Sequence, residues 1–285
     1  MNLKLRPATP ADAQTCGAIV FSAFAAMSDK HSFPRDIPAP EAGVGLLQML
    51  TNTPGFFGVV AEVDGKIVGS NFLDERSPIA GIGPITIDPN HQDKSVGREL
   101  MRAVIDRVNE KQYAGVRLVQ AAWHGRSLSL YTKLGFVVRE PLAVMQGNPI
   151  GKTIAGCEVR PAKQSDLDAC NELCSTIHGH HRGGELSGSI EHDSAVVVER
   201  HGRITGYSTL VGFFGHTVGE TNDDVKAILA AAPAFQGPGF LLPIRNTDLF
   251  RWCLDNGLRV IQPMTLMSIG LYNEPAGAFL PSILY

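Results

Sequence analysis

A turn rich in small and polar residues separates an apolar run from an amphipathic segment in the first half of the chain. Residues 85–101 read ITIDPNHQDKSVGRELM, in which Gln92, Ser95 and Gly97 have the spacing Gln-x-x-Ser-x-Gly. The apolar spacing after the turn predicts a helix. Its first N–H groups lack intrahelical partners and lie at the positive end of the helix dipole, so they can bind phosphate oxygens. An ordinary strand–turn–helix corner has the same pattern, and a second motif has to decide.

The second motif is SLSLYTKLGF at residues 127–136, which follows the β-type run VRLVQAA at residues 116–122. Leu128, Tyr131 and Leu134 lie three apart, on one face of a predicted helix. Gly135 is typical of the residue that ends a helix before a strand. This spacing directs the Tyr131 side chain into the protein.

The elements before these motifs are also predictable. A short strand at residues 3–6 precedes a helix with Thr9 as N-cap, which runs to about residue 27. A second helix is expected at residues 41–51. A hairpin follows around Asp64-Gly65, and a third strand at residues 81–87 leads into the turn.

This order, with Gln-x-x-Ser-x-Gly and Tyr-x-x-x-Gly-Phe, resembles the GNAT superfamily of N-acetyltransferases, which use acetyl-CoA as co-substrate. The resemblance implies an α/β fold with a mixed, mostly antiparallel sheet flanked by helices. The chain departs from the family at Ser95, where a glycine is usual, and at His124 and Ser127, where Asn and Ala are usual. Serine is tolerated at position 95 if its φ is negative, and its hydroxyl could donate to a phosphate.

The family resemblance assigns a role to each part of the site. Backbone groups near Thr86 and Ile87 would hold the pantetheine arm and polarise the thioester carbonyl, and Tyr131 would be the general acid. Tyr131 could instead be an aromatic core residue. The expected cofactor-binding residues are Thr86, Ile87, Gln92, Asp93, Lys94, Ser95, Val96, Gly97, Arg98, His124 and Ser127.

The general base and the acceptor site are less determined. Glu75 and His124 are the candidate bases, with Asp74 also near; His124 could instead be a helix N-cap and Glu75 a turn residue. Transfer through water, or arrival of a neutral amine, stays open. The loop at residues 28–40 could contact a cationic amine or could be a plain surface loop. Its candidate substrate contacts are Asp29, His31, Phe33 and Asp36.

The chain also contains an internal repeat. Arg6-Pro7-Ala8 with Asp12 recurs as Arg160-Pro161-Ala162 with Asp166, and GKIVG at residues 65–69 recurs as GRITG at residues 202–206. This predicts two tandem GNAT-like domains, residues 1–147 and residues 156–285, separated by a Gly- and Pro-rich linker.

The second copy differs where the chemistry would be. Cys253 stands where Tyr131 stands in the first copy, and no glycine turn precedes the corresponding helix. Glu220, Asp223 and Asp224 crowd that helix start and would repel a pyrophosphate. The second domain is therefore expected to be degenerate, without coenzyme A, and to complete the structure or shape the substrate site.

Composition limits the class of protein. Hydrophobic residues make up 44% and charged residues 19% of the chain, as in a globular protein with an ample core. A net charge of -3 and the lack of a basic run argue against nucleic acid as a partner. No signal-like or membrane-length apolar segment occurs, and the five cysteines have no disulfide spacing, so a cytoplasmic protein is expected.

A zinc site is the alternative for one cluster. Cys170, Cys174 and His178 stand four apart, with His180 and His181 just beyond. Cysteines at this spacing are also typical of a core helix, and no metal is expected.

Two functions follow. One is an N-acetyltransferase that moves the acetyl group of acetyl-CoA to a primary amine of a small molecule or peptide, acting as a monomer or homodimer. The other is a catalytically silent acyl-CoA-binding or sensing protein, which the departures at Ser95 and His124 would favour.

Overall fold

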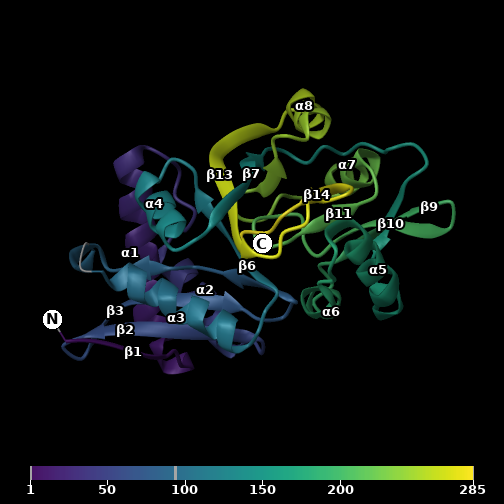
Figure 1. The fold of residues 1–285 in the computed structure, drawn as a ribbon. Coiled ribbons are helices and arrows are strands. Elements are labelled where there is room, and N and C mark those ends of the chain that lie inside the picture. Colours follow the sequence, from purple (N-terminus) through teal and green to yellow (C-terminus); the bar gives the residue numbers. More distant parts are fainter. Residues whose placement is uncertain (1, 93–94, 285) are drawn as a thin grey trace.

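The computed structural model describes residues 2–92 and 95–284, and its two halves lie side by side (Figure 1). In the first half, two helices pack together between the first and second strands, and two further helices follow the strands that end at the site. Its elements are β1 (Leu3–Pro7), the 3-10 turn Pro10–Asp12, α1 (Ala13–His31), α2 (Pro40–Asn52), β2 (Phe56–Val63), β3 (Lys66–Asp74), β4 (Ile79–Ile82), β5 (Thr86–Ile87), the 3-10 turn Pro89–His91, α3 (Val96–Glu110), β6 (Gly115–Ala121), α4 (Gly125–Lys133) and β7 (Val137–Gln146).

Alternation along the strands separates the two faces of the first-half sheet. Val59 and Ala61 of β2 belong to a core cluster with Leu100 and Val104 of α3. The intervening Val60 instead packs in the cluster of α1 and α2. The sheet is therefore covered by α1 and α2 on one face and by α3 on the other, as the period of two along a strand requires.

The second half repeats this plan with shorter helices. Its five-stranded sheet has the order β14-β11-β10-β9-β8, with α5 and α6 on one core cluster and α7 on another. Its elements are β8 (Glu158–Pro161), the 3-10 turn Gln164–Asp166, α5 (Leu167–His178), α6 (Gly183–Glu191), β9 (Val196–Arg200), β10 (Arg203–Ser208), β11 (Thr217–Gly219), α7 (Asn222–Ala231), β12 (Phe240–Pro243), α8 (Thr247–Asp255), β13 (Arg259–Gly270) and β14 (Ala278–Leu280).

Equivalent ion pairs show that the internal repeat is structural. Arg6 donates to Asp12 at 2.8 Å and to Glu62 at 2.7 Å. Arg160 donates to Asp166 and to Glu199, both at 2.7 Å. In each copy the arginine ties the first strand to the helix start and to the neighbouring strand. The predicted α/β fold, with two copies of one plan and a mixed, mostly antiparallel sheet in the first half, is confirmed.

The two halves exchange their long strands. β13 of the second half lies between β6 and β7 of the first half, antiparallel to both, from Met264 opposite Ala121 to Gly270 opposite Gly115. In turn, β7 lies between β13 and β12 of the second half. In Figure 1 these strands meet between the two halves. Each half therefore supplies a strand to the sheet of the other half. The domain boundary at residues 147–156 stays a prediction from the sequence.

Two element boundaries differ from expectation. α1 continues to His31, four residues beyond the predicted end near residue 27, and it ends at Ser32 in the left-handed conformation. The predicted strand at residues 81–87 is two strands: β4 ends at Ile82, and β5 begins at Thr86. The break contains Pro84, which has no N–H to continue the ladder.

Cys170 and Cys174 are fully buried in the core beneath α5, together with Leu173 and Ile177. They pack there as small apolar side chains, and burial raises the pKa of both thiols. Within the described ranges, no group of three His, Cys, Asp or Glu side chains is placed to hold a metal ion. Among the described residues, no helix is long and apolar enough to cross a membrane.

Candidate active site

The break between β4 and β5 opens a slot in the first-half sheet. β4 pairs in parallel with β6 only from Ile79 to Gly81. Thr86 and Ile87 of β5 pair with β3 on one side. Along the described chain, the other edge of β5 and the facing edge of β6 pair with no strand, so their backbone N–H and C=O groups are available to a ligand.

The slot leads into a cavity of about 800 Å³, which both halves of the chain line. Of the residues expected in the site, those that line it are His31, Asp36, Thr86, Ile87, Gln92, Ser95, Val96, Gly97, Arg98, His124, Ser127 and Tyr131. Asp93 and Lys94 lie outside the described residues. The strands, the turn and the tyrosine helix therefore converge on one cavity, as the family resemblance implies.

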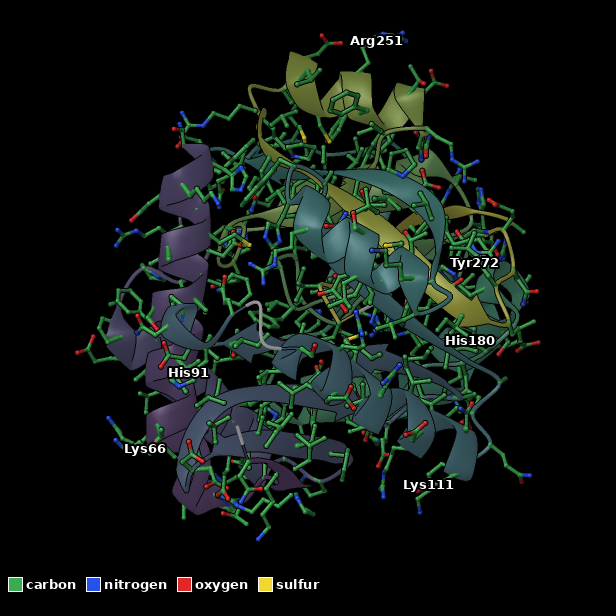
Figure 2. The ribbon with its side chains drawn as sticks, turned by 60° about the vertical axis from the view of Figure 1, so that its left-hand side comes forward. Lys66, His91, Lys111, His180, Arg251 and Tyr272 are labelled. Carbon is green, nitrogen blue, oxygen red and sulfur yellow. The ribbon has the colours of Figure 1, made fainter. Side chains whose placement is uncertain are left out.

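The turn before α3 presents the helix N-terminus to this cavity. Arg126 at the start of α4 donates to the Gln92 side chain at 3.2 Å and so ties the turn to the tyrosine helix. His91 also lines the cavity and lies beside α1 (Figure 2). At Gly97, a Cβ would stand 3.2 Å from Ile87 Cδ1, which is a tight contact, so glycine allows α3 to approach β5 closely. Backbone donors with Arg98 and Arg126 nearby suit an anionic group.

Ser95 has a different backbone conformation from the one expected. Its φ is +63°, in the left-handed region, so the condition of a negative φ is not met. Glycine adopts this region freely, but a residue with a Cβ does so at a cost of about 1 kcal/mol or more. The usual family glycine at this position thus has a physical reason, and the serine is held in a strained turn.

We expect Ser95→Gly to raise the stability of the free protein by about 1 kcal/mol, because it relieves this strain. The melting temperature should rise by roughly 2–4 °C. Thermal unfolding followed by circular dichroism measures the change. Ser129→Gly, in the interior of α4, is the control and should lower the melting temperature, because glycine is unfavourable there. A lower melting temperature for Ser95→Gly would show that the serine side chain stabilises the turn.

Tyr131 is the buried residue of α4 and lines the cavity. Its ring packs edge-on against Phe136, with ring centroids 6.1 Å apart. Burial raises the pKa of the phenol well above its ordinary value, so the O–H keeps its proton at every physiological pH. A protonated phenol at a cavity wall can donate to a leaving group.

Three buried polar atoms at the cavity have no hydrogen-bond partner within the described part of the chain: the Thr86 hydroxyl, the Gln120 side-chain nitrogen and His91 Nδ1. His91 Nδ1 lies 3.5 Å from the Asp88 carboxylate, so the Thr86 hydroxyl and the Gln120 nitrogen are the two that face no charged partner. The Gln120 oxygen is engaged, since it accepts from the Ser127 hydroxyl at 2.9 Å. Buried donors of this kind are normally satisfied, so they favour a polar ligand in the slot.

His124 belongs to an aromatic cluster at the cavity. Its ring centroid lies 6.0 Å from that of His31 and 6.2 Å from that of Trp123. Burial, followed by the charges of His31, Arg126 and Lys30, lowers the pKa of His124, which keeps the ring neutral at neutral pH. His124 occupies the N-cap position of α4, but its side chain makes no capping hydrogen bond, so the N-cap interpretation is wrong for the ring.

Asp36 is a half-buried carboxylate that lines the cavity. Gln262 of β13 donates to its Oδ1 at 2.6 Å, and Trp123 Nε1 donates to the Gln262 oxygen at 3.0 Å. Burial raises the pKa of Asp36 to about 6, although the Gln262 hydrogen bond opposes this shift. Asp36 thus titrates close to neutral pH, where a proton acceptor is most effective.

Four candidate site residues lie elsewhere. Glu75 does not line the cavity, and its carboxylate accepts from Arg107 at 2.6 and 2.9 Å. That ion pair keeps Glu75 from acting as a base in the cavity, and the adjacent Asp74 is likewise paired with Arg76. Asp29 pairs with Arg35 outside the cavity, and Phe33 stacks on Trp123, with centroids 4.6 Å apart, rather than lining it. The structure does not support these positions as a catalytic base or as direct substrate contacts.

The second half supplies one wall of the cavity. Its chain end reaches the first-half sheet, where a Cβ at Gly81 would meet the Leu284 carbonyl at 1.9 Å. Ile283 N–H donates to the Phe213 carbonyl at 2.8 Å, which holds the chain end against the loop after β10. The second-half residues at the cavity are Phe213, Phe214, Pro238, Met264, Ile283 and Leu284.

The corresponding site of the second half is filled by its own side chains. Asp224 accepts from the Thr221 N–H at 2.8 Å and from its hydroxyl at 2.7 Å, so a carboxylate already caps α7. Cys253, in place of the tyrosine, is fully buried in the core. The prediction that this half binds no coenzyme A agrees with that geometry and stays a prediction.

The sequence and the fold resemble those of known acetyltransferases. Residues 23–136 match the model of the acetyltransferase (GNAT) family. A protein described as an acetyltransferase, from Pyrococcus horikoshii, superposes with a TM-score of 0.74 at 17% identity, covering 98% of this chain and 94% of that one. A GCN5-related N-acetyltransferase from Sphaerobacter thermophilus gives 0.62 at 15% identity, covering 95% and 96%.

A tandem GNAT protein from the clavulanic acid biosynthesis pathway superposes with a TM-score of 0.54 at 13% identity, covering 94% of this chain and 98% of that one. Comparison with curated protein sequences finds no match. The fold is that of a tandem GNAT protein. The GNAT acetyltransferase family match lies in the first half of the chain, and the likeness of the whole chain to these solved structures shows its fold.

The sequence predicted that the second half could shape the substrate site, but it did not identify the residues that do so. Gln262 and Met264 are separated from the cavity motifs by more than a hundred residues, and no local pattern marks them. Gln120 was also missed, because it sits inside an apolar strand pattern that predicts only burial. Asp36 was named as a possible substrate contact, and its acidic side chain was the only signal.

Proposed function

We propose that this protein is an N-acetyltransferase that moves the acetyl group of acetyl-CoA to a primary amine by direct attack on the thioester. The supporting observation is the convergence of the splayed β5–β6 edges, the α3 turn and Tyr131 on one cavity. Their chemistry matches the three needs of the reaction: a site for an extended amide chain, a grip for phosphates and a proton donor.

The residues present fit the co-substrate. Free backbone groups of β5 and β6 can pair with the amides of a pantetheine arm, and the unsatisfied Thr86 hydroxyl and Gln120 nitrogen lie beside them. The N–H groups at the start of α3, with Arg98 and Arg126, can hold the pyrophosphate. Acetyl-CoA supplies the activated acyl group; the chain supplies orientation and proton transfer.

Each residue then has a defined task. Backbone N–H groups of the β5 segment polarise the carbonyl that the amine attacks. Tyr131 Oη donates a proton as negative charge develops on the departing sulfur, and its raised pKa keeps that proton in place until then. The apolar walls exclude water, so hydrolysis of the thioester is suppressed.

An assay of free thiol released from acetyl-CoA across a panel of primary amines tests the proposal. We expect release that depends on both the amine and the protein, with the acetylated amine identified by mass spectrometry. Coenzyme A binding without thiol release for any amine would instead favour a silent acyl-CoA sensor. The strained Ser95 is the observation that favours that second function, because it departs from the family turn.

A further inference from the structure

We propose that Asp36 receives the acceptor's ammonium group and removes its proton, and that the acceptor is a primary amine carried on an apolar body. This inference rests on the proposed function and deepens it. It assigns the base to the loop between α1 and α2 and assigns the specificity to a wall built by the second half of the chain.

The position of Asp36 supports its role as the base. Its Oδ1 accepts from Gln262, which is itself held by Trp123, so the carboxylate has a defined orientation in the cavity. Neither Glu75 nor Asp29 can replace it, because each is ion-paired with an arginine outside the cavity. Of the carboxylates on the described residues, Asp36 is the one at the cavity wall.

The residues that line the cavity support an acceptor amine with an apolar body. The apolar side chains that line the same cavity include Ile37, Leu46 and Phe24 of the first half and Phe213 and Met264 of the second. A single carboxylate among apolar walls favours one cationic nitrogen on a hydrophobic group. A second ammonium group would lose its hydration there with no anionic partner, and an acceptor carboxylate would be repelled by Asp36.

The reaction balances as follows. The ammonium N–H bond breaks and its proton passes to the Asp36 carboxylate, which leaves a neutral amine. The amine nitrogen forms the new C–N bond as the C–S bond breaks, and Tyr131 protonates the departing sulfur. The proton that the new amide nitrogen loses restores Tyr131 through water, and the proton on Asp36 passes to solvent. The products are an N-acetyl amine, coenzyme A and one proton.

The other groups at the cavity define the pH dependence. Lys30 and His31 of α1 and His124 and Arg126 at α4 line the same cavity, and burial is the dominant cause of the shift at Asp36. Because the carboxylate must be deprotonated, kcat/KM should rise with pH through about 6 and then level off. Without this base, the rate should keep rising toward the amine's own pKa, at about pH 10.

The experiment uses the full chain with acetyl-CoA and compares Asp36→Asn with the matched control Asp29→Asn. With 2-phenylethylamine at pH 7, we expect Asp36→Asn to lower kcat/KM by about 10²–10³-fold and to lose the inflection near pH 6. Asp29→Asn should behave as the wild type. Calorimetric titration of 2-phenylethylamine into the coenzyme A-loaded protein gives a readout independent of turnover, and Asp36→Asn should weaken this binding at least about tenfold.

Folding of the variant can be checked separately. Asn keeps an oxygen for Gln262, and it removes a carboxylate whose pKa is raised on folding. Because such a group destabilises the folded state above its folded pKa, Asp36→Asn should melt at a higher temperature than the wild type at pH 8. The hydrogen bond from Gln262 lowers the pKa of Asp36. Gln262→Leu removes this bond, so the pKa should rise and the inflection should move to higher pH.

The outcomes separate the two proposals. Acetyl transfer that prefers spermidine or glycine over 2-phenylethylamine and hexylamine, or that is unchanged in Asp36→Asn, would overturn the acceptor-site inference and leave the acetyltransferase standing. Asp36-dependent binding of 2-phenylethylamine without thiol release would support the acceptor site and overturn the acetyltransferase. Preference for the apolar amines with loss in Asp36→Asn supports both.

Discussion

Tyr131→Phe is expected to lower kcat for acetyl transfer by about 10²–10³-fold, while the Kd for coenzyme A stays within about twofold. The substitution removes one oxygen and keeps the ring that packs against Phe136 and the α3 core. The departing thiolate would then lose its proton donor, but no group that holds the co-substrate would change. Steady-state kinetics of thiol release and titration of coenzyme A measure the two effects.

Tyr113→Phe is the matched control for this variant. The Tyr113 hydroxyl donates to the Glu75 backbone carbonyl at 3.1 Å, and the residue does not line the cavity. Its loss should cost about 1 kcal/mol of stability and leave kcat unchanged. Unchanged turnover in Tyr131→Phe would remove the general-acid role, and a parallel loss of coenzyme A affinity would make Tyr131 a binding residue.

Separation of the two halves should abolish folding of each. A chain of residues 1–147 would lose β13 from between β6 and β7, which exposes both strand edges and their apolar side chains. Leu142, Val144 and Met145 of β7 are buried in clusters shared with the second half. Loss of these contacts exceeds the total stability of about 5–15 kcal/mol that a protein of this kind has. Solubility and circular dichroism of the isolated half would measure the result.

Two controls define this prediction. Residues 1–147 and 156–285 expressed together should form a soluble complex, because each supplies the strand that the other needs. A full chain nicked at Gly151 in the exposed linker should stay folded, since Gly151 belongs to no strand and the cut leaves the pairing between the halves intact. Cooperative unfolding of isolated residues 1–147 near the melting temperature of the full chain would show that the strand exchange is dispensable.

Local interactions explain which elements were predictable. The Thr9–Asp12 capping interaction and the Asp64-Gly65 hairpin involve residues close in the chain, so their types determine the structure. The family resemblance implied backbone contacts near Thr86 and Ile87, but it did not predict the slot between β5 and β6 or the proline break that opens it. The sign of φ at Ser95 was left open by the sequence, and the turn imposes a positive value.

The candidate base Glu75 lies away from the cavity for a related reason, whereas the candidate His124 lines it. Glu75 is near the site motifs in the sequence, yet its side chain forms an ion pair with Arg107 of α3 outside the cavity. Asp36 lies in a loop whose composition is compatible with a plain surface segment. Its raised pKa depends on burial by the folded chain, which outweighs the opposing effect of a hydrogen bond from Gln262, 226 residues away.

The sequence by itself determined the order of elements, the repeat, the helix start that faces the cavity and the inward-facing Tyr131. Each of these depends on residue spacing within one or two elements, where periodicity and capping are decisive. Only the tertiary structure decided that the halves exchange strands and that the second half walls the cavity. Strand pairing and burial are long-range properties: any apolar strand can pair with any other, and the partner is selected by the packing of the whole chain.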